Sequence, residues 1–183
     1  KLFIFDFDGT VANSLETITY YVNMTLKQYN LKAFNQNKIR YFVGNGASLL
    51  IERALKARDC YTEDFHKEFL EKYLKNYNSD AMYLTEPYEG ILETLAQLKL
   101  RGIKLAILSN KPDSSVQLAT ASLFGKKLFD VATGQKNGYP IKPDATLGKT
   151  ILEKFGVSPD ECVYIGDTDV DMQTGKNLGA FTV

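Results

Sequence analysis

Two aspartates follow the first apolar run of the chain, in the stretch FIFDFDGT that covers residues 3–10. Asp6 and Asp8 are one residue apart, so an extended chain would turn both carboxylates to the same face. If the chain turns after Asp6, the Asp8 side chain lies to one flank, and the two groups still crowd one place. A lone aspartate at a strand end is usually a cap or a turn former. A pair directly behind a buried strand instead indicates acid–base or nucleophilic chemistry.

A second acidic group lies near the other end of the chain, where GDTDVDM contains Asp167, Asp169 and Asp171. Carboxylates gathered at one edge of a sheet would repel one another unless a cation lay among them. Carboxylate and carbonyl oxygens suit Mg²⁺, which prefers hard ligands. The single histidine, His66, belongs to a helical stretch and lacks partner ligands, so we interpret it as a structural residue.

Two further segments could bind a phosphate group. Ser109 and Asn110 follow the apolar run IKLAIL and precede a predicted helix, where a hydroxyl and free backbone N–H groups form an anion site. Lys142 also precedes a predicted helix, although an isolated lysine is most often a solvated surface residue. Lys111 stands before a Pro-Asp pair as Lys142 does, so spacing alone does not decide which lysine points inward. A carboxylate nucleophile, a metal, a hydroxyl and a lysine together are the components of phosphoryl transfer.

Strands and helices alternate through most of the chain and would position these groups. The pattern predicts strands over residues 2–5, 103–109, 130–134, 161–167 and 180–183, and helices over residues 88–102, 112–125, 142–156 and 170–179. Pro112 and Pro143 suit the first turn of their helices. Such alternation implies a parallel β-sheet with helices on both faces, a Rossmann-like three-layer α/β core. Ligands of such sheets bind at the carboxyl ends of the strands, where all four polar segments fall.

Residues 13–82 have a different pattern, with helical periodicity, polar or glycine-containing breaks and no apparent strand. The helices are expected over residues 14–29, 35–43, 46–57 and 62–77. We therefore predict an α/β core formed by residues 1–12 and 83–183, with an all-α helical cap, residues 13–82, inserted after the first strand.

Composition limits the possible partners. The 183 residues carry 22 Lys+Arg and 22 Asp+Glu, a balance that gives no overall field to attract nucleic acid or an anionic membrane. No apolar run approaches the ~20 residues that span a bilayer. Two cysteines indicate no disulfide framework, and we expect a cytoplasmic protein. The chain begins without Met and ends in GAFTV, which resembles the opening of a strand, so we expect further residues at both ends.

In chain order, DFDGT, the strand-end Ser109, Lys142 and GDTDVD resemble the four motifs of the haloacid dehalogenase-like (HAD) hydrolase superfamily. The resemblance covers the whole chain, including the inserted helices. Within that superfamily, the segments VGNGASLLIERAL, LSNKPD and IKPD are similar to those of bacterial phosphoglycolate phosphatases. The resemblance implies a Mg²⁺-dependent phosphatase that hydrolyses a small phosphorylated metabolite, a phosphate monoester, through an aspartyl-phosphate intermediate.

The resemblance also implies roles for the aspartates. Asp6 would be the nucleophile, and Asp8 would protonate the leaving alkoxide and then activate water. Repulsion between neighbouring carboxylates would raise the pKa of one of them, which would suit Asp8 to carry a proton. The Mg²⁺ ligands would be the Asp6 and Asp167 carboxylates and the Asp8 backbone carbonyl, with Asp171 behind them or on a metal-bound water.

The same resemblance assigns the phosphate contacts. Ser109 and Lys142 would bind the phosphoryl oxygens, helped by backbone N–H groups around Gly9 and Asn110, while Thr10 would orient the loop and assist there. The cap would close over this site, exclude water and select the substrate.

Three cap residues are candidates for substrate selection. Gly44 and Gly46 precede a helix whose N–H groups could meet a substrate carboxylate, and Arg40 could pair with the same group. Each has a plainer interpretation, a helix–helix turn for the glycines and a solvated charge for Arg40. Asn13 departs from the Asp common in relatives, but it caps a helix equally well.

Several alternatives stay open. A nucleotidase, a pyrophosphatase or a β-phosphoglucomutase-like enzyme would share the core site, because the cap sets specificity. A dehalogenase needs neither a second acid nor a metal, so DFD argues against it. A receiver domain carries its phosphoacceptor after a middle strand and has no helical insertion, and a non-catalytic binding module would be expected to have lost one of the four motifs. The sequence leaves both a monomer and a homodimer open.

Overall fold

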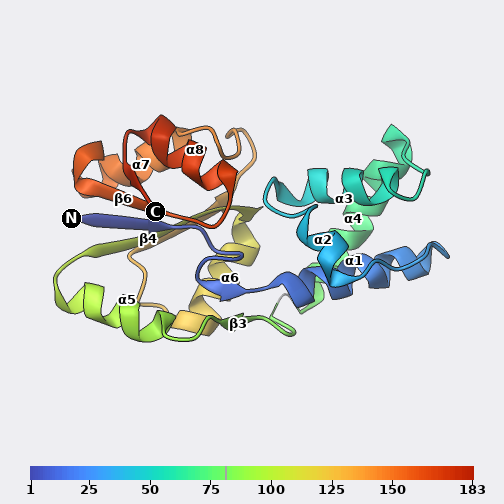
Figure 1. The fold of residues 1–183 in the computed structure, drawn as a ribbon, viewed down its shortest axis with the longest axis horizontal. Coiled ribbons are helices and arrows are strands. Elements are labelled where there is room, and N and C mark those ends of the chain that lie inside the picture. The colour runs from blue at the N-terminus through green and yellow to red at the C-terminus, as the bar shows by residue number, and fades with distance from the viewer. Residues whose placement is uncertain (81) are drawn as a thin grey trace. The chain divides into compact units, whose positions relative to one another are not determined.

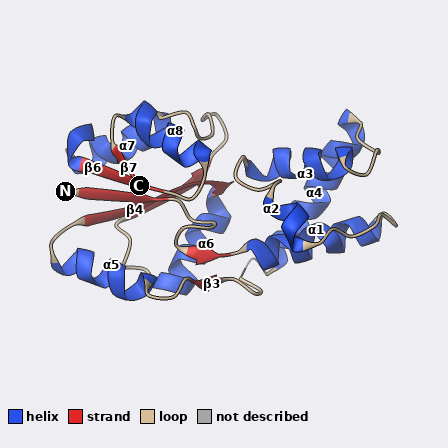
Figure 2. Ribbon diagram, viewed as in Figure 1, coloured by secondary structure: helices blue, strands red, loops and turns tan. Residues whose placement is uncertain are grey.

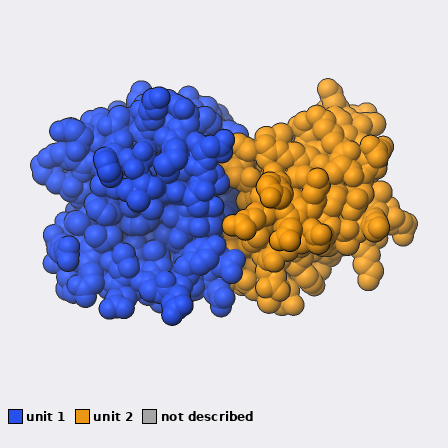
Figure 3. Space-filling view, in the orientation of Figure 1, with its two compact units in different colours: residues 1–13, 86–183 blue, residues 14–85 orange. Residues whose placement is uncertain are grey.

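The computed structural model describes residues 1–80 and 82–183 (Figure 1). The chain divides into two compact units, residues 1–13 with 86–183 and residues 14–85 (Figure 3). The divisions fall after residues 13 and 85, where the sequence pattern placed them after 12 and 82. Among the described residues, no helix is both long enough and apolar enough to cross a membrane.

The first unit is built on a five-stranded parallel sheet in the order β5-β4-β1-β6-β7. Its strands are β1 (Leu2–Phe5), β4 (Lys104–Pro112), β5 (Val131–Gln135), β6 (Cys162–Ile165) and β7 (Phe181–Thr182). Its helices are α5 (Ile91–Leu100), α6 (Asp113–Phe124), α7 (Thr146–Phe155) and α8 (Asp169–Leu178), with a short 3-10 turn, Pro159–Glu161. Figure 2 shows α7 and α8 on one face of the sheet and α5 and α6 on the other. The predicted three-layer α/β fold is confirmed.

Alternation along the central strand β1 determines where Asp6 points. Leu2 and Ile4 pack in the apolar cluster formed with α7 and α8. Phe5 and Phe7 instead make edge contacts with aromatic rings on the opposite face. Asp6 has the parity of Leu2 and Ile4, and it follows directly on a strand that is apolar on both faces. Burial of the strand therefore fixes the side of the sheet on which the Asp6 carboxylate lies.

Strand β4 is longer than the sequence indicated. It continues through Ser109 to Pro112, with an irregular register against β5 between Leu108 and Pro112. The end of β4 approaches β5 closely there because Gly134 has no side chain to meet the Lys111 carbonyl oxygen. The Gly134 N–H also donates to Oδ1 of Asp113, the first residue of α6, at 2.8 Å. The polar segment expected after the strand therefore lies within it.

The two prolines do not occupy the predicted first helical turns. Pro112 is the N-cap residue of α6, and α7 begins only at Thr146, so Pro143 lies outside that helix. A turn lies between Pro143 and α7. In this turn, Asp144 Oδ1 accepts a hydrogen bond from the Thr146 N–H at 2.7 Å.

A small antiparallel pair, β2 (Ala12–Asn13) and β3 (Glu86–Pro87), joins the two points at which the chain leaves and re-enters the first unit. Two-residue strands have no periodicity that a sequence could reveal, and this pair was not predicted.

The described residues of the second unit, 14–80 and 82–85, form four helices, α1 (Leu15–Gln28), α2 (Gln36–Arg40), α3 (Gly46–Lys56) and α4 (Glu63–Ser79). The ends of α1, α3 and α4 agree with the predicted helices to within two residues, whereas α2 stops three residues early. Their apolar faces form one core rich in aromatic rings, in which Phe69 of α4 is fully buried.

We predict that Gly134→Ala destabilises the protein by roughly 1–3 kcal/mol, the usual cost of overpacking. A Cβ at this position would lie 2.5 Å from the Lys111 carbonyl oxygen and 2.8 Å from Asp113 N, both backbone atoms. Gly148→Ala is the control, because its Cβ would meet only side-chain atoms, the nearest being Leu178 methyls at 3.2 Å, and alanine favours helix by ~1 kcal/mol. Urea unfolding measures both variants, and equal stability of the two would contradict the close approach of β4 and β5.

Candidate active site

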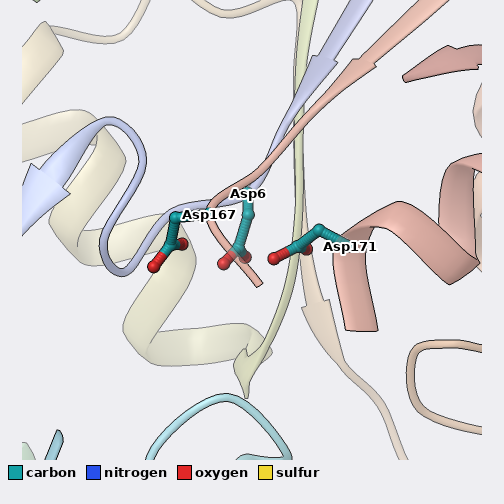
Figure 4. A group of neighbouring side chains, drawn as sticks. All are labelled: Asp6, Asp167 and Asp171. Atoms are coloured by element: carbon teal, nitrogen blue, oxygen red, sulfur yellow. The ribbon is translucent and has the colours of Figure 1, made fainter. Parts of the chain in front are cut away.

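Three carboxylates converge at the carboxyl ends of β1 and β6 (Figure 4). Asp6 follows β1, Asp167 follows β6, and Asp171 lies in the first turn of α8. One carboxylate oxygen of each lies within 4.8 Å of the others. Asp169 belongs to the same acidic motif but is exposed, and its Oδ1 accepts a hydrogen bond from the Val170 N–H at 3.0 Å. The convergence predicted from strand-end spacing is therefore observed for Asp6, Asp167 and Asp171.

A buried lysine lies between two of these aspartates. Lys142 Nζ is 2.8 Å from Asp6 Oδ1 and 2.7 Å from Asp171 Oδ1. Only the second contact is aligned as a hydrogen bond. Lys142 is 4% exposed and Asp171 is fully buried. Of the two candidate lysines, Lys142 thus contacts the predicted nucleophile.

Burial and charge act in opposite directions on this cluster. Burial raises the pKa of Asp6 to about 6, against the lowering effect of the Lys142 ammonium, and the charge of Asp171 adds to the rise. Burial lowers the pKa of Lys142, but the carboxylates of Asp6 and Asp171 outweigh it, so that this pKa is raised. The lysine is therefore a permanent cation within the site, and Asp6 is a carboxylate that a further positive charge would favour in its ionised form.

Asp8 has a lysine of its own. Lys111 Nζ donates to Asp8 Oδ1 at 2.9 Å and approaches Oδ2 at 3.3 Å, and it also lies 5.6 Å from the centre of the Phe7 ring. Among the influences on the pKa of Asp6, the charge of Asp8 is the smallest. The charge of Asp8, in which the sequence suggested the basis of a division of roles, therefore affects the pKa of Asp6 less than burial and Lys142 do.

Both oxygens of Asp171 have partners. Oδ1 meets Lys142, while Oδ2 accepts hydrogen bonds from the Thr168 backbone N–H at 3.2 Å and from its hydroxyl at 2.6 Å. The bond from the Thr168 N–H and a reciprocal one, in which the Asp171 N–H donates to Thr168 Oγ1 at 3.4 Å, form a capping box at the start of α8. Gly166 is required beside it, since a Cβ there would overlap the Asp171 side chain. The two carboxylate oxygens of Asp171 are therefore both occupied, one by Lys142 and the other by the first turn of α8.

Asp167 is the most open of the three carboxylates, and the loop after β1 holds it. Thr10 Oγ1 donates to Asp167 Oδ1 at 3.1 Å. Partial burial raises the pKa of Asp167, against this hydrogen bond. Gly9 has φ +88°, and a Cβ there would overlap the Asp167 carboxylate, so only glycine fits. Gly9 and Thr10, proposed as phosphate contacts, are thus placed against the metal-ligand candidate.

Asn110 has a role that the sequence did not reveal. Its side-chain amide exchanges two hydrogen bonds with the Lys142 backbone, Nδ2 to the carbonyl oxygen at 3.1 Å and Oδ1 from the N–H at 2.8 Å. The pair joins the end of β4 to the loop that carries the lysine. Ser109 is also buried at this point, 4% exposed. Partners 32 residues apart leave no local pattern, so only the fold shows this link.

The donor set fits a hard divalent cation. Asp6 and Asp167 offer carboxylate oxygens close together, and Asp6 Oδ1 is buried without an aligned hydrogen-bond donor. A buried anionic oxygen in that state is stabilised by a metal ion such as Mg²⁺, which takes oxygen ligands. Asp171 fits a position behind such an ion, because the lysine and the helix cap already occupy its oxygens.

The cap candidates lie in the second unit. Gly44 and Gly46 have φ +109° and +83°, backbone conformations that favour glycine. Asn45 between them accepts a hydrogen bond on Oδ1 from Arg53 Nη2 at 3.0 Å, so Arg53, which the sequence did not single out, holds this loop. Arg40 ends α2 and is exposed.

Known proteins share this sequence and fold. A family model of haloacid dehalogenase-like hydrolases matches residues 3–183. The phosphoglycolate phosphatase of Aquifex aeolicus is 31% identical over 182 residues, which cover 100% of this chain and 83% of that protein. The phosphoglycolate phosphatase of Colwellia psychrerythraea is 32% identical over 180 residues, which cover 96% of this chain and 80% of that protein. A crystal structure of a predicted phosphoglycolate phosphatase from Haemophilus somnus matches with a TM-score of 0.93 and 30% identity. The match covers 100% of this chain and 83% of that one. The chain belongs to the haloacid dehalogenase-like hydrolases, as its motifs predicted.

In the metal-free protein, Asp6 should titrate near pH 6. Because this folded-state pKa exceeds that of an unfolded aspartate, the folded state binds the extra proton, and its stabilising effect is lost as the pH rises from about 4 through 6. The unfolding free energy of the wild type relative to Asp6→Asn should therefore fall by roughly 2 kcal/mol between pH 4 and pH 6. Urea unfolding in EDTA at several pH values measures it. A difference that does not change with pH would contradict the burial effect.

Proposed function

We propose that this protein is a Mg²⁺-dependent phosphatase that hydrolyses a small phosphate monoester through an aspartyl phosphate, with 2-phosphoglycolate as the first candidate substrate. The observation that carries the proposal is the buried Lys142 ammonium beside Asp6, at the strand ends where Asp167 also lies. A carboxylate, a fixed cation and an oxygen-ligand site are what phosphoryl transfer to a protein side chain requires. The names of the relatives support the substrate.

The reaction has two steps. In the first, an Asp6 carboxylate oxygen attacks phosphorus, the bond from phosphorus to the ester oxygen breaks, and Asp8 gives a proton to the departing alkoxide. In the second, Asp8 takes a proton from water, the water oxygen attacks phosphorus, and Asp6 leaves as a carboxylate. Asp8 ends protonated, as it began, so the cycle closes.

Charge on the transferred group is met by residues that are already in place. Lys142, held by Asp171, and the Ser109 hydroxyl are assigned to the phosphoryl oxygens, together with backbone N–H groups near Gly9, Thr10 and Asn110. These groups are held in position before the substrate arrives, so little reorganisation is needed during the reaction. Mg²⁺, held by the Asp6 and Asp167 carboxylates and the Asp8 carbonyl, would supply further neutralisation as a Lewis acid.

The helical unit, residues 14–85, is assigned the role of a cap that selects the substrate. Gly44 and Gly46 at the start of α3, with Arg40, are its candidates for a substrate carboxylate. A cytoplasmic location and a monomeric or homodimeric state belong to the same proposal. A nucleotidase, a pyrophosphatase and a phosphomutase would use the same core, and phosphate release from a panel of esters, nucleotides and pyrophosphate separates them from the proposed activity.

Asp6→Asn should lower phosphate release from 2-phosphoglycolate by roughly 10³-fold or more, because the amide is a poor nucleophile. Asp169→Asn is the matched control, since Asp169 lies in the same acidic motif but is exposed and bonds its neighbour's N–H. We expect the control to stay within about twofold of the wild type, as other exposed substitutions do. A near-normal rate for Asp6→Asn would refute Asp6 as the nucleophile.

Removing divalent cations with EDTA should abolish phosphate release, and Mg²⁺ should restore it. Thr10→Val keeps the side-chain shape but removes the hydrogen bond to Asp167, so the Mg²⁺ concentration for half-maximal rate should rise roughly 10-fold. Rates measured across a Mg²⁺ series give this value. An unchanged rate in EDTA, or an unchanged Mg²⁺ requirement in Thr10→Val, would argue against the assigned metal ligands.

A further inference from the structure

Lys111, which pairs with Asp8, has no part in the mechanism above. Lys111 lies near the end of β4, and Asp8 lies in the loop after β1. The Lys111 ammonium contacts both carboxylate oxygens of Asp8, at 2.9 and 3.3 Å. The lysine side chain is 5% exposed and that of Asp8 is 15% exposed. The contact is therefore built into the carboxyl-terminal edge of the sheet and is not a surface ion pair.

Stability alone does not account for this pair. Taking an ammonium and a carboxylate out of water costs several kcal/mol per ion, and an apolar pair of similar size is often as stable or more so. The backbone of Lys111 is also fixed, because its carbonyl oxygen packs against Gly134 where no Cβ fits. The Phe7 ring lies 5.6 Å from Nζ on a further side. Such an arrangement holds the ammonium in one place and through it the Asp8 carboxylate.

We propose that Lys111 is a positioning residue, which acts through Asp8 by holding its carboxyl group in the orientation that proton transfer to the leaving oxygen needs. The inference rests on the proposed function, in which Asp8 is the acid and base. A carboxyl group that rotates freely about its last bond would give or take the proton in many directions, and contact of the Lys111 ammonium with the Asp8 oxygens limits that rotation. Misplacement of a reacting group by about 1 Å can cost roughly 10²-fold in rate. Lys142 serves other carboxylates, Asp6 and Asp171, so the two lysines have separate tasks.

Two substrates separate this role from phosphate binding. The alkoxide that leaves 2-phosphoglycolate needs a proton, whereas the p-nitrophenolate that leaves p-nitrophenyl phosphate is stable without one. Lys111→Met should lower kcat/KM for 2-phosphoglycolate roughly 10²-fold and for p-nitrophenyl phosphate less than about 10-fold, because kcat/KM covers the steps through the first phosphoryl transfer. Lys111→Arg keeps the charge but moves it, and should show the same selective loss in smaller size; it decides the question if the Met variant does not fold. An equal loss for both substrates would overturn the proposal.

A double-mutant cycle tests whether Lys111 acts through Asp8. In an Asp8→Asn background the group to be positioned is gone, so adding Lys111→Met should change kcat/KM less than about threefold. If the lysine binds the phosphoryl group or only supports the fold, its loss would cost as much in this background as in the wild type, and the inference would be wrong. Thermal melting of each variant confirms folding. Phosphate release by the wild type from both esters tests the proposed function independently of Lys111.

Discussion

Charge balance in a buried cluster is the constraint on which the site depends. Asp6 and Asp171 lie at one edge of the sheet where water is largely excluded, and they are tolerated there because Lys142 lies 2.8 and 2.7 Å from them. Lys111 does the same for Asp8. Breaking such a buried pair by removing one partner costs several kcal/mol, since the remaining charge has no water to replace it. The lysines therefore make it possible for Asp6 and Asp171 to be buried in the site and for Asp8 to be partly buried, whereas Asp167 is exposed.

The elements of the core serve this cluster. β1 is apolar on both faces, so its alternation leaves Asp6 no other direction. The capping box of α8 gives Asp171 fixed partners on one oxygen and leaves the other for Lys142. The amide of Asn110 connects the β4 edge to the loop that brings the lysine in. Small residues complete the cluster, because side chains at Gly9 and Gly166 would displace Asp167 and Asp171.

Much of this was predictable from the sequence, for physical reasons. Apolar strands alternate with helices of regular period, and this pattern predicted the three layers of the core. Two of the strands end in aspartates, which predicted that Asp6, Asp167 and Asp171 converge. The inward direction of the lysines was not predictable, because Lys111 and Lys142 each precede a proline in similar segments and the structure turns both inward. The Asn110 link, the β2–β3 pair and the end of β4 depend on contacts distant in the chain. The sequence also could not show that burial and Lys142 would outweigh the charge of Asp8 in setting the pKa of Asp6, because both depend on the rest of the fold.

The central claim is that Asp6 accepts the phosphoryl group. Acid quenching of the protein during turnover of 2-phosphoglycolate, followed by peptide mass spectrometry, tests it most directly, because an acyl phosphate survives brief exposure to acid. We predict that one phosphoryl group is found on the peptide that carries FIFDFDGT and that fragmentation places it on Asp6. Rapid turnover with no phosphorylated peptide, or with the phosphoryl group on another residue, would contradict the account.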